Sequence, residues 1–242
     1  MKTPTTSPSF QFSTTLLVAG LALTTLAGCA AKSARPAAAA TPAPATTAAP
    51  ASTIAPNATP ATAELAWATF GPATATTGQG GFINTFSYSE KPGDVAMDAL
   101  TITGDLLQVR GNFVAKGASA WGGLGVSVEA GNNQPMDASG YKTLRIRLAA
   151  PNGAKLRLRL NGTDTKVRDS GCFPSFTQAV TAKDTVYEIA LSRFAPEAYC
   201  GANGATVAQT LPRFAMVEVA DTSDPVKARA SHFSIGAISL LP

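Results

Sequence analysis

The chain has 242 residues, of which 45% are hydrophobic and 14% are charged, and its formal net charge is +4 at pH 7. A charge this small gives no argument for nucleic acid as a partner, and a single histidine leaves little material for acid–base or metal chemistry. The distribution of charge is more informative than its sum, because several basic residues fall in one short stretch near the middle of the chain.

The N-terminus, residues 1–28, is expected to be a secretory signal, because a basic start precedes an apolar run at 16–23 that is too short to span a bilayer. The tetrapeptide LAGC at 26–29 resembles a bacterial lipobox, which implies cleavage before Cys29 and lipidation of its thiol. An ordinary signal beside a chance cysteine is the alternative. Because Ala30 and not aspartate follows the cysteine, the resemblance implies the outer membrane of the cell envelope, facing periplasm or surface.

Residues 29–63 are almost entirely alanine, proline and threonine, so they cannot bury a core. This composition predicts an extended, semi-rigid tether that holds the folded part away from the membrane. The membrane contact is therefore expected through the lipid anchor only. The remaining residues, 64–242, are enough for one domain with its own core.

The domain is expected to consist of short strands, because nearly every periodic segment alternates apolar and polar residues. Glycine, proline, asparagine and aspartate separate them, and no long stretch has helical periodicity. The expected strands lie, with loops, at 67–88, 100–103, 106–110, 121–128, 144–148, 155–160, 173–180, 185–191, 215–220 and 232–241. This pattern predicts an all-β, jelly-roll β-sandwich, with an open barrel as the alternative.

The stretch 141–160 has the clearest pattern, in which leucines or isoleucine alternate with basic residues on both sides of a Pro-Asn-Gly turn at 151–153. It predicts a β-hairpin with one face in the core and the other strongly basic. The arginines of that predicted face are Arg145, Arg147, Arg157 and Arg159.

Two interpretations of the basic face remain open. In the first it is solvated, and Glu188 and Glu218, which occupy the polar phase of their own strands, form ion pairs with the arginines. In the second it is a concave binding face for carboxylate, sulfate, phosphate or polyhydroxyl groups, which suit planar guanidinium groups. Trp121, in phase with the glycines of its strand, either stacks on a sugar there or packs in the core or between loops. Nucleic acid is not expected, because few aromatic residues lie among the basic ones.

Cys172 and Cys200 are an even pair once Cys29 is lipidated, and an oxidising compartment favours a disulfide between them. On the chain-entropy account such a bond contributes roughly 3–4 kcal/mol. It would bring Phe173 and Tyr199 together at a loop edge, where packing is the expected role. A metal site is less expected, because neither cysteine belongs to a CxxC motif.

No catalytic residue is assigned. The sequence has no G-x-S-x-G motif, and the histidine, His232, begins a strand, where a structural role is expected. Carboxylates for a paired-carboxylate glycosidase exist, but no spacing selects two of them. They are Glu129, Asp137, Glu188 and Glu218.

Four motifs in order carry a resemblance to a known family: WGGLG at 121–125, MDASGYKTLRI at 136–146, YEIALSRF at 187–194 and FSIGAISL at 233–240. Over about 82–241 the chain resembles the galactose-binding-like jelly roll, and most of all family-11 carbohydrate-binding modules and complex I intermediate-associated domains. It departs from them at positions 236 and 237, where glycine and alanine stand in place of acidic residues that help hold a structural calcium ion. No cofactor is therefore expected, and a calcium site is in question.

The expected function is that of a lipid-anchored, extracytoplasmic, non-catalytic binding module. Its ligand is expected to be a carbohydrate, with acidic polysaccharide as one option, held on the arginine-bearing face. The first alternative is an envelope assembly factor that docks the acidic surface of a protein partner on the same face. The second is a glycan hydrolase on a sandwich scaffold.

Overall fold

The computed structural model describes residues 63–71, 81–114, 122–131, 134–224 and 227–242. The predictions on the signal peptide, the lipidation of Cys29, the tether and Trp121 lie outside these residues. Among the residues that are described, no helix has the length and apolar character needed to cross a membrane.

Twelve strands of the described chain form two antiparallel sheets. The seven-stranded sheet contains β1 (Leu65–Ala68), β3 (Val95–Met97), β4 (Thr101–Thr103), β5 (Leu106–Phe113), β7 (Thr143–Ala149), β10 (Thr185–Ala190) and β12 (Arg229–Leu241). The five-stranded sheet contains β2 (Ile83–Ser89), β6 (Gly122–Glu129), β8 (Ala154–Gly162), β9 (Ser175–Val180) and β11 (Phe214–Asp221).

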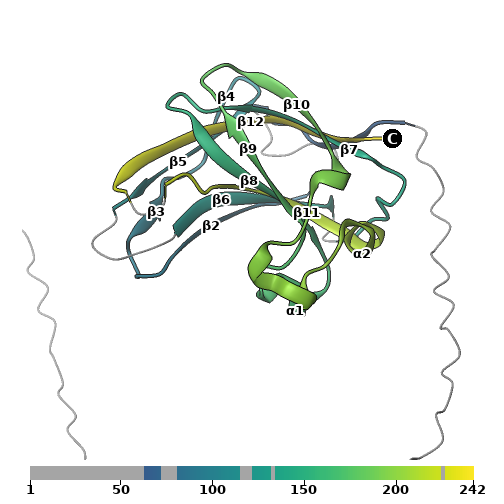
Figure 1. The fold of residues 1–242 in the computed structure, drawn as a ribbon. Coiled ribbons are helices and arrows are strands. Elements are labelled where there is room, and N and C mark those ends of the chain that lie inside the picture. The colour runs from purple at the N-terminus through teal and green to yellow at the C-terminus, as the bar shows by residue number, and fades with distance from the viewer. Residues whose placement is uncertain (1–62, 72–80, 115–121, 132–133, 225–226) are drawn as a thin grey trace, which may run out of the picture. The chain divides into compact units, whose positions relative to one another are not determined.

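The two sheets lie face to face as the layers of a sandwich (Figure 1). The order in the larger sheet is β10-β7-β12-β5-β3, with β1 paired to β12 and β4 paired to β5. The order in the smaller sheet is β2-β6-β11-β8-β9. The predicted all-β jelly-roll sandwich is therefore confirmed, and the core lies between the sheets.

The residues that fill this core are those that the alternating pattern of the sequence predicted to be buried. On β6, Leu124, Val126 and Val128 are buried, while Gly123 and Gly125 take the opposite phase. The leucines and the isoleucine of β7 and β8 are also fully buried. One face of every long strand is therefore core, and the opposite face is the outer surface of its sheet.

The predicted hairpin over 141–160 is wrong, because its two strands belong to different sheets. β7 pairs with β10 and β12, whereas β8 pairs with β11 and β9. The turn at 151–153, where Gly153 has φ +72°, carries the chain from one layer to the other. Both strands still bury their apolar phase, so alternation alone could not distinguish this crossing from a hairpin. As a result the four arginines do not share one face.

Short helices lie in the part of the sequence between β8 and β11, before β9 and after β10. They are α1 (Thr165–Asp169), η2 (Leu191–Arg193), η3 (Ala198–Asn203), α2 (Val207–Thr210) and η4 (Leu211–Arg213). Asp164 caps α1 by accepting hydrogen bonds from two backbone N–H groups, and Thr206 and Gln209 form a capping box on α2. Figure 1 shows α1 beneath the layer that contains β6 and β11, which is the outer side of the five-stranded sheet.

Candidate functional site

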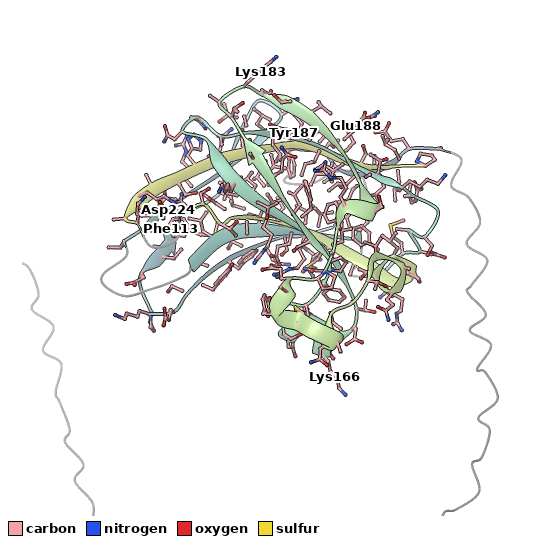
Figure 2. All side chains as sticks on the ribbon, in the orientation of Figure 1. Phe113, Lys166, Lys183, Tyr187, Glu188 and Asp224 are labelled. Carbon is pink, nitrogen blue, oxygen red and sulfur yellow. A yellow bond between two sulfur atoms is a disulfide. The ribbon has the colours of Figure 1, made fainter. Side chains whose placement is uncertain are left out.

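The outer surface of the seven-stranded sheet carries Arg145 and Arg147, and we call it the exposed face. Each guanidinium contacts two carboxylates, at N···O distances between 2.6 and 2.9 Å. The partners are Glu64 and Glu188 for Arg145, and Asp105 and Asp184 for Arg147. Figure 2 shows Glu188 on β10 at the top of the view and Lys166 on α1 at the bottom. Four carboxylates surround two arginines, so this face is not basic.

These ion pairs shift the pKa values of their members. The hydrogen bond from Arg147 holds the pKa of Asp105 below its usual 3.8. Hydrogen bonds to Asp105 and Asp184 raise the pKa of Arg147 in turn. The carboxylates are 43–65% exposed, so water and salt screen these interactions. The predicted ion pair between Glu188 and an arginine is present, and its partner is Arg145.

The outer surface of the five-stranded sheet, which we call the covered face, carries the other two arginines. Strand register places Glu218 beside Arg159 and Ala220 beside Arg157, with Asn161 two residues further along β8. The side chains of both arginines and of Glu218 are only 10–11% exposed, although they point away from the core. Segments outside the sheet therefore cover this face.

A buried network of two arginines and two glutamates occupies the centre of the covered face. Glu218 Oε1 accepts hydrogen bonds from Arg157 Nη2 at 3.0 Å and from Arg159 Nη1 at 3.2 Å. Glu197 Oε1, from the loop before η3, accepts from Arg157 Nη1 and Arg159 Nη2, both at 3.3 Å. Burial opposes the charge of Arg157, but Tyr88, Glu218 and Glu197 outweigh it and raise its pKa. The four charges of the network balance to zero.

Three polar atoms of this region remain without a hydrogen bond within the described chain. They are Arg157 Nε, Arg159 Nε and Asn161 Oδ1, and all three are buried. Most buried polar groups in folded proteins have a partner, so three orphans on one surface need an explanation. Two of them are donors and one is an acceptor.

Aromatic rings lie beside the network. Phe86 and Tyr88, from β2, stack with an interplanar angle of 12° and centroids 6.2 Å apart. A Cβ at Gly123 would lie 2.6 Å from the Tyr88 ring, and one at Gly125 would lie 2.9 Å from that of Phe86. Gly123 therefore makes room for the Tyr88 ring, whereas a Cβ at Gly125 would first meet the carbonyl oxygen of Val219 at 2.3 Å. No bulge interrupts the pairing of β6 with β2 or β11.

The predicted disulfide between Cys172 and Cys200 is confirmed, with a Cα–Cα distance of 5.6 Å. It ties the segment after α1 to the loop that carries Glu197 and Tyr199. The Tyr199 hydroxyl donates a hydrogen bond to the carbonyl oxygen of Gly171 at 3.2 Å. A Cβ at Gly171 would lie within 3.7 Å of both the Tyr199 hydroxyl and the Arg159 guanidinium. Tyr199, 66% exposed, therefore lies at the rim of the covered face.

The other predicted residues lie apart from this network. His232 on β12 contacts Gln108 Oε1 at 3.0 Å, and burial followed by the charge of Arg110 lowers its pKa. Asp137 accepts a hydrogen bond from the backbone of Ser139 at 2.9 Å.

The candidate carboxylates for glycosidase chemistry are divided between the two faces. Glu188 belongs to the exposed face, Glu218 is held by Arg157 and Arg159, and Glu129 accepts a hydrogen bond from Asn84. Within the described ranges, no three histidine, cysteine, aspartate or glutamate side chains are grouped to hold a metal ion.

Sequence reasoning missed several residues of the covered face. Phe86 and Tyr88 alternate with polar residues in INTFSYS at 83–89, a pattern that shows two rings on one side of a strand. Asn161 continues the phase of Arg157 and Arg159 along β8. Glu197 gives no signal of its own, because only the folded, disulfide-bonded loop brings it to the arginines.

No family model and no curated protein matches the chain. Among solved structures, the chain is similar to the family 11 carbohydrate-binding module from Clostridium thermocellum in complex with a β-1,3-1,4-mixed-linked tetrasaccharide. That similarity has a TM-score of 0.45 and 15% identity, over 65% of this chain and 88% of the other.

Two further solved structures are similar at comparable levels. A family 29 carbohydrate-binding module has a TM-score of 0.39 and 11% identity, over 74% of this chain and 87% of the other. An agarase has a TM-score of 0.40 and 12% identity, over 62% of this chain and 24% of the other. The resemblance to family-11 carbohydrate-binding modules predicted from the motifs thus reappears in the comparison of structures.

Proposed function

We propose that the protein is a non-catalytic carbohydrate-binding module and that its covered face binds a neutral polysaccharide. The observation that carries the proposal is the buried, charge-balanced network of that face together with its three unpartnered polar atoms. Sugar hydroxyl groups both donate and accept hydrogen bonds, so one class of ligand can satisfy the two Nε–H groups and the amide oxygen when the side chains that bury these atoms move aside.

Charge balance favours a neutral ligand over an acidic one. Each guanidinium of the network already contacts two carboxylates, so an anionic ligand would have to compete with Glu197 and Glu218. The same reasoning disfavours an acidic protein partner on the exposed face, where Arg145 and Arg147 are also doubly paired. These four arginines therefore do not offer the unpaired positive charge that those alternatives need.

The aromatic residues complete the site. Tyr88 on β2 borders the network, with its ring centroid 5.9 Å from Arg157 Cζ, and Phe86 stacks beside Tyr88. Tyr199 lies at the rim of the covered face on the disulfide-bonded loop. Ligand sites commonly combine aromatic walls with a few fixed polar groups. Because strands and a disulfide hold these groups in place, little conformational entropy is lost on binding.

The membrane anchor is part of the proposal. Lipidation at Cys29 would attach the module to the outer membrane, and the tether would let it reach a polymer beyond the surface. Labelling of cells with a radioactive fatty acid tests this step: incorporation into the protein should vanish in the C29A variant. Label that persists in C29A would contradict the anchor.

Affinity electrophoresis tests the binding. The purified protein is run in gels that contain mixed-linked β-glucan, xyloglucan or agarose as neutral polymers, and alginate or polygalacturonate as acidic ones, at low and high salt. We expect retardation by a neutral polymer that persists at high salt, because no net charge drives it. Y199A should weaken the retardation, while the double variant R145A/R147A, a matched change on the exposed face, should retain it. Retardation only by acidic polymers, abolished by salt, would contradict the proposal.

A further inference from the structure

A separate cavity lies at the helical end of the five-stranded sheet, between α1, the loop after the disulfide and α2. Its volume is about 420 Å³, within the range of small-molecule sites in proteins. The lining residues used below are Thr163, Asp164, Phe173, Asn203, Gln209 and Arg213. None of them belongs to the buried network, so the cavity is distinct from the covered face.

The cavity has an apolar side. The Phe173 ring and Val167 line it, and Phe173 is only 2% exposed. At Gly162 a Cβ would lie 3.3 Å from both the Phe173 ring and the carbonyl oxygen of Arg213. A larger residue at position 162 would therefore crowd this wall, and glycine keeps it open.

The polar side offers both donors and acceptors. In the described ranges Arg213 forms no ion pair, so its guanidinium is not neutralised by a neighbour. Asp164 uses Oδ1 to cap α1, which leaves Oδ2 as an acceptor. Gln209 uses Oε1 in the capping box with Thr206, which leaves its amide nitrogen as a donor.

We propose that this cavity binds a single neutral sugar residue of about hexose size, which adds a second carbohydrate site to the one on the covered face. A sugar has apolar C–H surface that can face Val167 and hydroxyl groups for the guanidinium, the amide and the carboxylate. A neutral molecule is favoured because an anion would face Asp164 and a cation would face Arg213. The volume of the cavity suits a monosaccharide or the end of a chain.

Saturation-transfer NMR and calorimetry on the full protein test the proposal, with glucose, galactose, mannose and xylose as separate probes and glucuronate as the anionic comparison. We expect saturable binding of at least one neutral sugar. R213A should weaken it about tenfold or more, because hydrogen bonds to charged groups are strong. A202W should block it, since Ala202 is an exposed residue on the lining and a large side chain there occupies the mouth.

Two matched variants serve as controls. Arg193 lies outside the lining, over the Phe176 ring at 4.3 Å, so R193A should leave monosaccharide binding unchanged. Y199A, on the covered face, should also leave it unchanged. No saturable binding of any neutral sugar, binding that survives both cavity variants, or tighter binding of glucuronate would overturn the inference.

The same proteins distinguish this inference from the proposed function. If polysaccharide gels fail to retard the protein but R213A and A202W abolish monosaccharide binding, only the proposed role of the covered face is wrong. If the gels retard A202W as they do the unmodified protein and no monosaccharide binds, only the cavity site is wrong.

Discussion

The two outer faces of the sandwich carry the same sequence pattern, yet they differ in burial and in chemistry. On the exposed face, Arg145 and Arg147 contact four carboxylates that water reaches. On the covered face, Arg157 and Arg159 share two carboxylates under a disulfide-bonded loop. Alternation therefore determines which side of a strand meets the core, but not what covers the other side.

The contrast also separates surface from buried ion pairs in energetic terms. Exposed pairs typically contribute about 0.2–1 kcal/mol, because water and salt screen them. Removing one partner from a buried network costs more, since the remaining charge loses both its partner and its access to water. Changes on the covered face should therefore have the larger effects.

The largest effect is expected for E218A. Loss of this carboxylate leaves the buried Arg157 and Arg159 with Glu197 alone, so we expect the free energy of unfolding to fall by about 3–5 kcal/mol. E188A, the matched change on the exposed face, should lower it by less than about 1 kcal/mol. Urea unfolding of both variants measures the difference. Equal losses of stability in the two variants would mean that the ion pairs of the two faces do not differ in strength.

The next largest loss of stability is expected when the disulfide is removed, because this bond holds the loop over the covered face and has no counterpart on the exposed face. The C172S/C200S variant should lose about 3–4 kcal/mol of stability on the chain-entropy account. Limited proteolysis should then cut near Tyr199 and Glu197, while the strands that carry Arg145 and Arg147 stay protected. An unchanged cleavage pattern would show that the loop holds its place over the face without the bond.

A smaller effect is expected for salt. Double-mutant cycles should give a coupling of about 0.2–1 kcal/mol for Arg145 and Glu188 in dilute buffer, and high salt should reduce it towards zero. The coupling of Arg159 and Glu218 should persist in the same salt, because both side chains are largely buried. If salt weakened both couplings by the same fraction, the proposed difference in burial between the two ion pairs would be contradicted.

The smallest effect concerns the titration of Asp105. Its pKa lies below 3.8 in the folded protein because Arg147 donates hydrogen bonds to it, so its stabilising contribution is present above that pH and is lost as pH falls through the lowered value. R147A should return the pKa towards 3.8, as measured by NMR. R145A should leave it unchanged, and a shift there would mean that the two arginines act as one cluster.

The fold was largely predictable from sequence, because the alternation of apolar and polar residues shows which side of each strand is buried. Leu124, Val126 and Val128 have the expected phase, and the turn at Gly104 separates β4 from β5 as expected. The partners of β7 and β8, which lie in different sheets, were not predictable in the same way, because a hairpin and a crossing between sheets both bury the leucines.

The candidate site was predictable only in part, because some of its residues are brought together by contacts between segments far apart in the sequence. Arg157, Arg159 and Glu218 were identified, because their phase along each strand shows that they point outward. Glu197 was missed, since its approach depends on a loop closed by residues far apart in the chain.

The most direct test of the account is an NMR titration that follows the arginine Nε–H signals, with the shortest oligosaccharide of a polymer that retards the protein. The Nε–H groups of Arg157 and Arg159 have no acceptor in the described chain, whereas those of Arg145 and Arg147 already donate to Glu188 and Asp184. We expect saturable shifts of the first two signals and none of the last two. Shifts confined to Arg145 and Arg147 would contradict the covered face as the binding site.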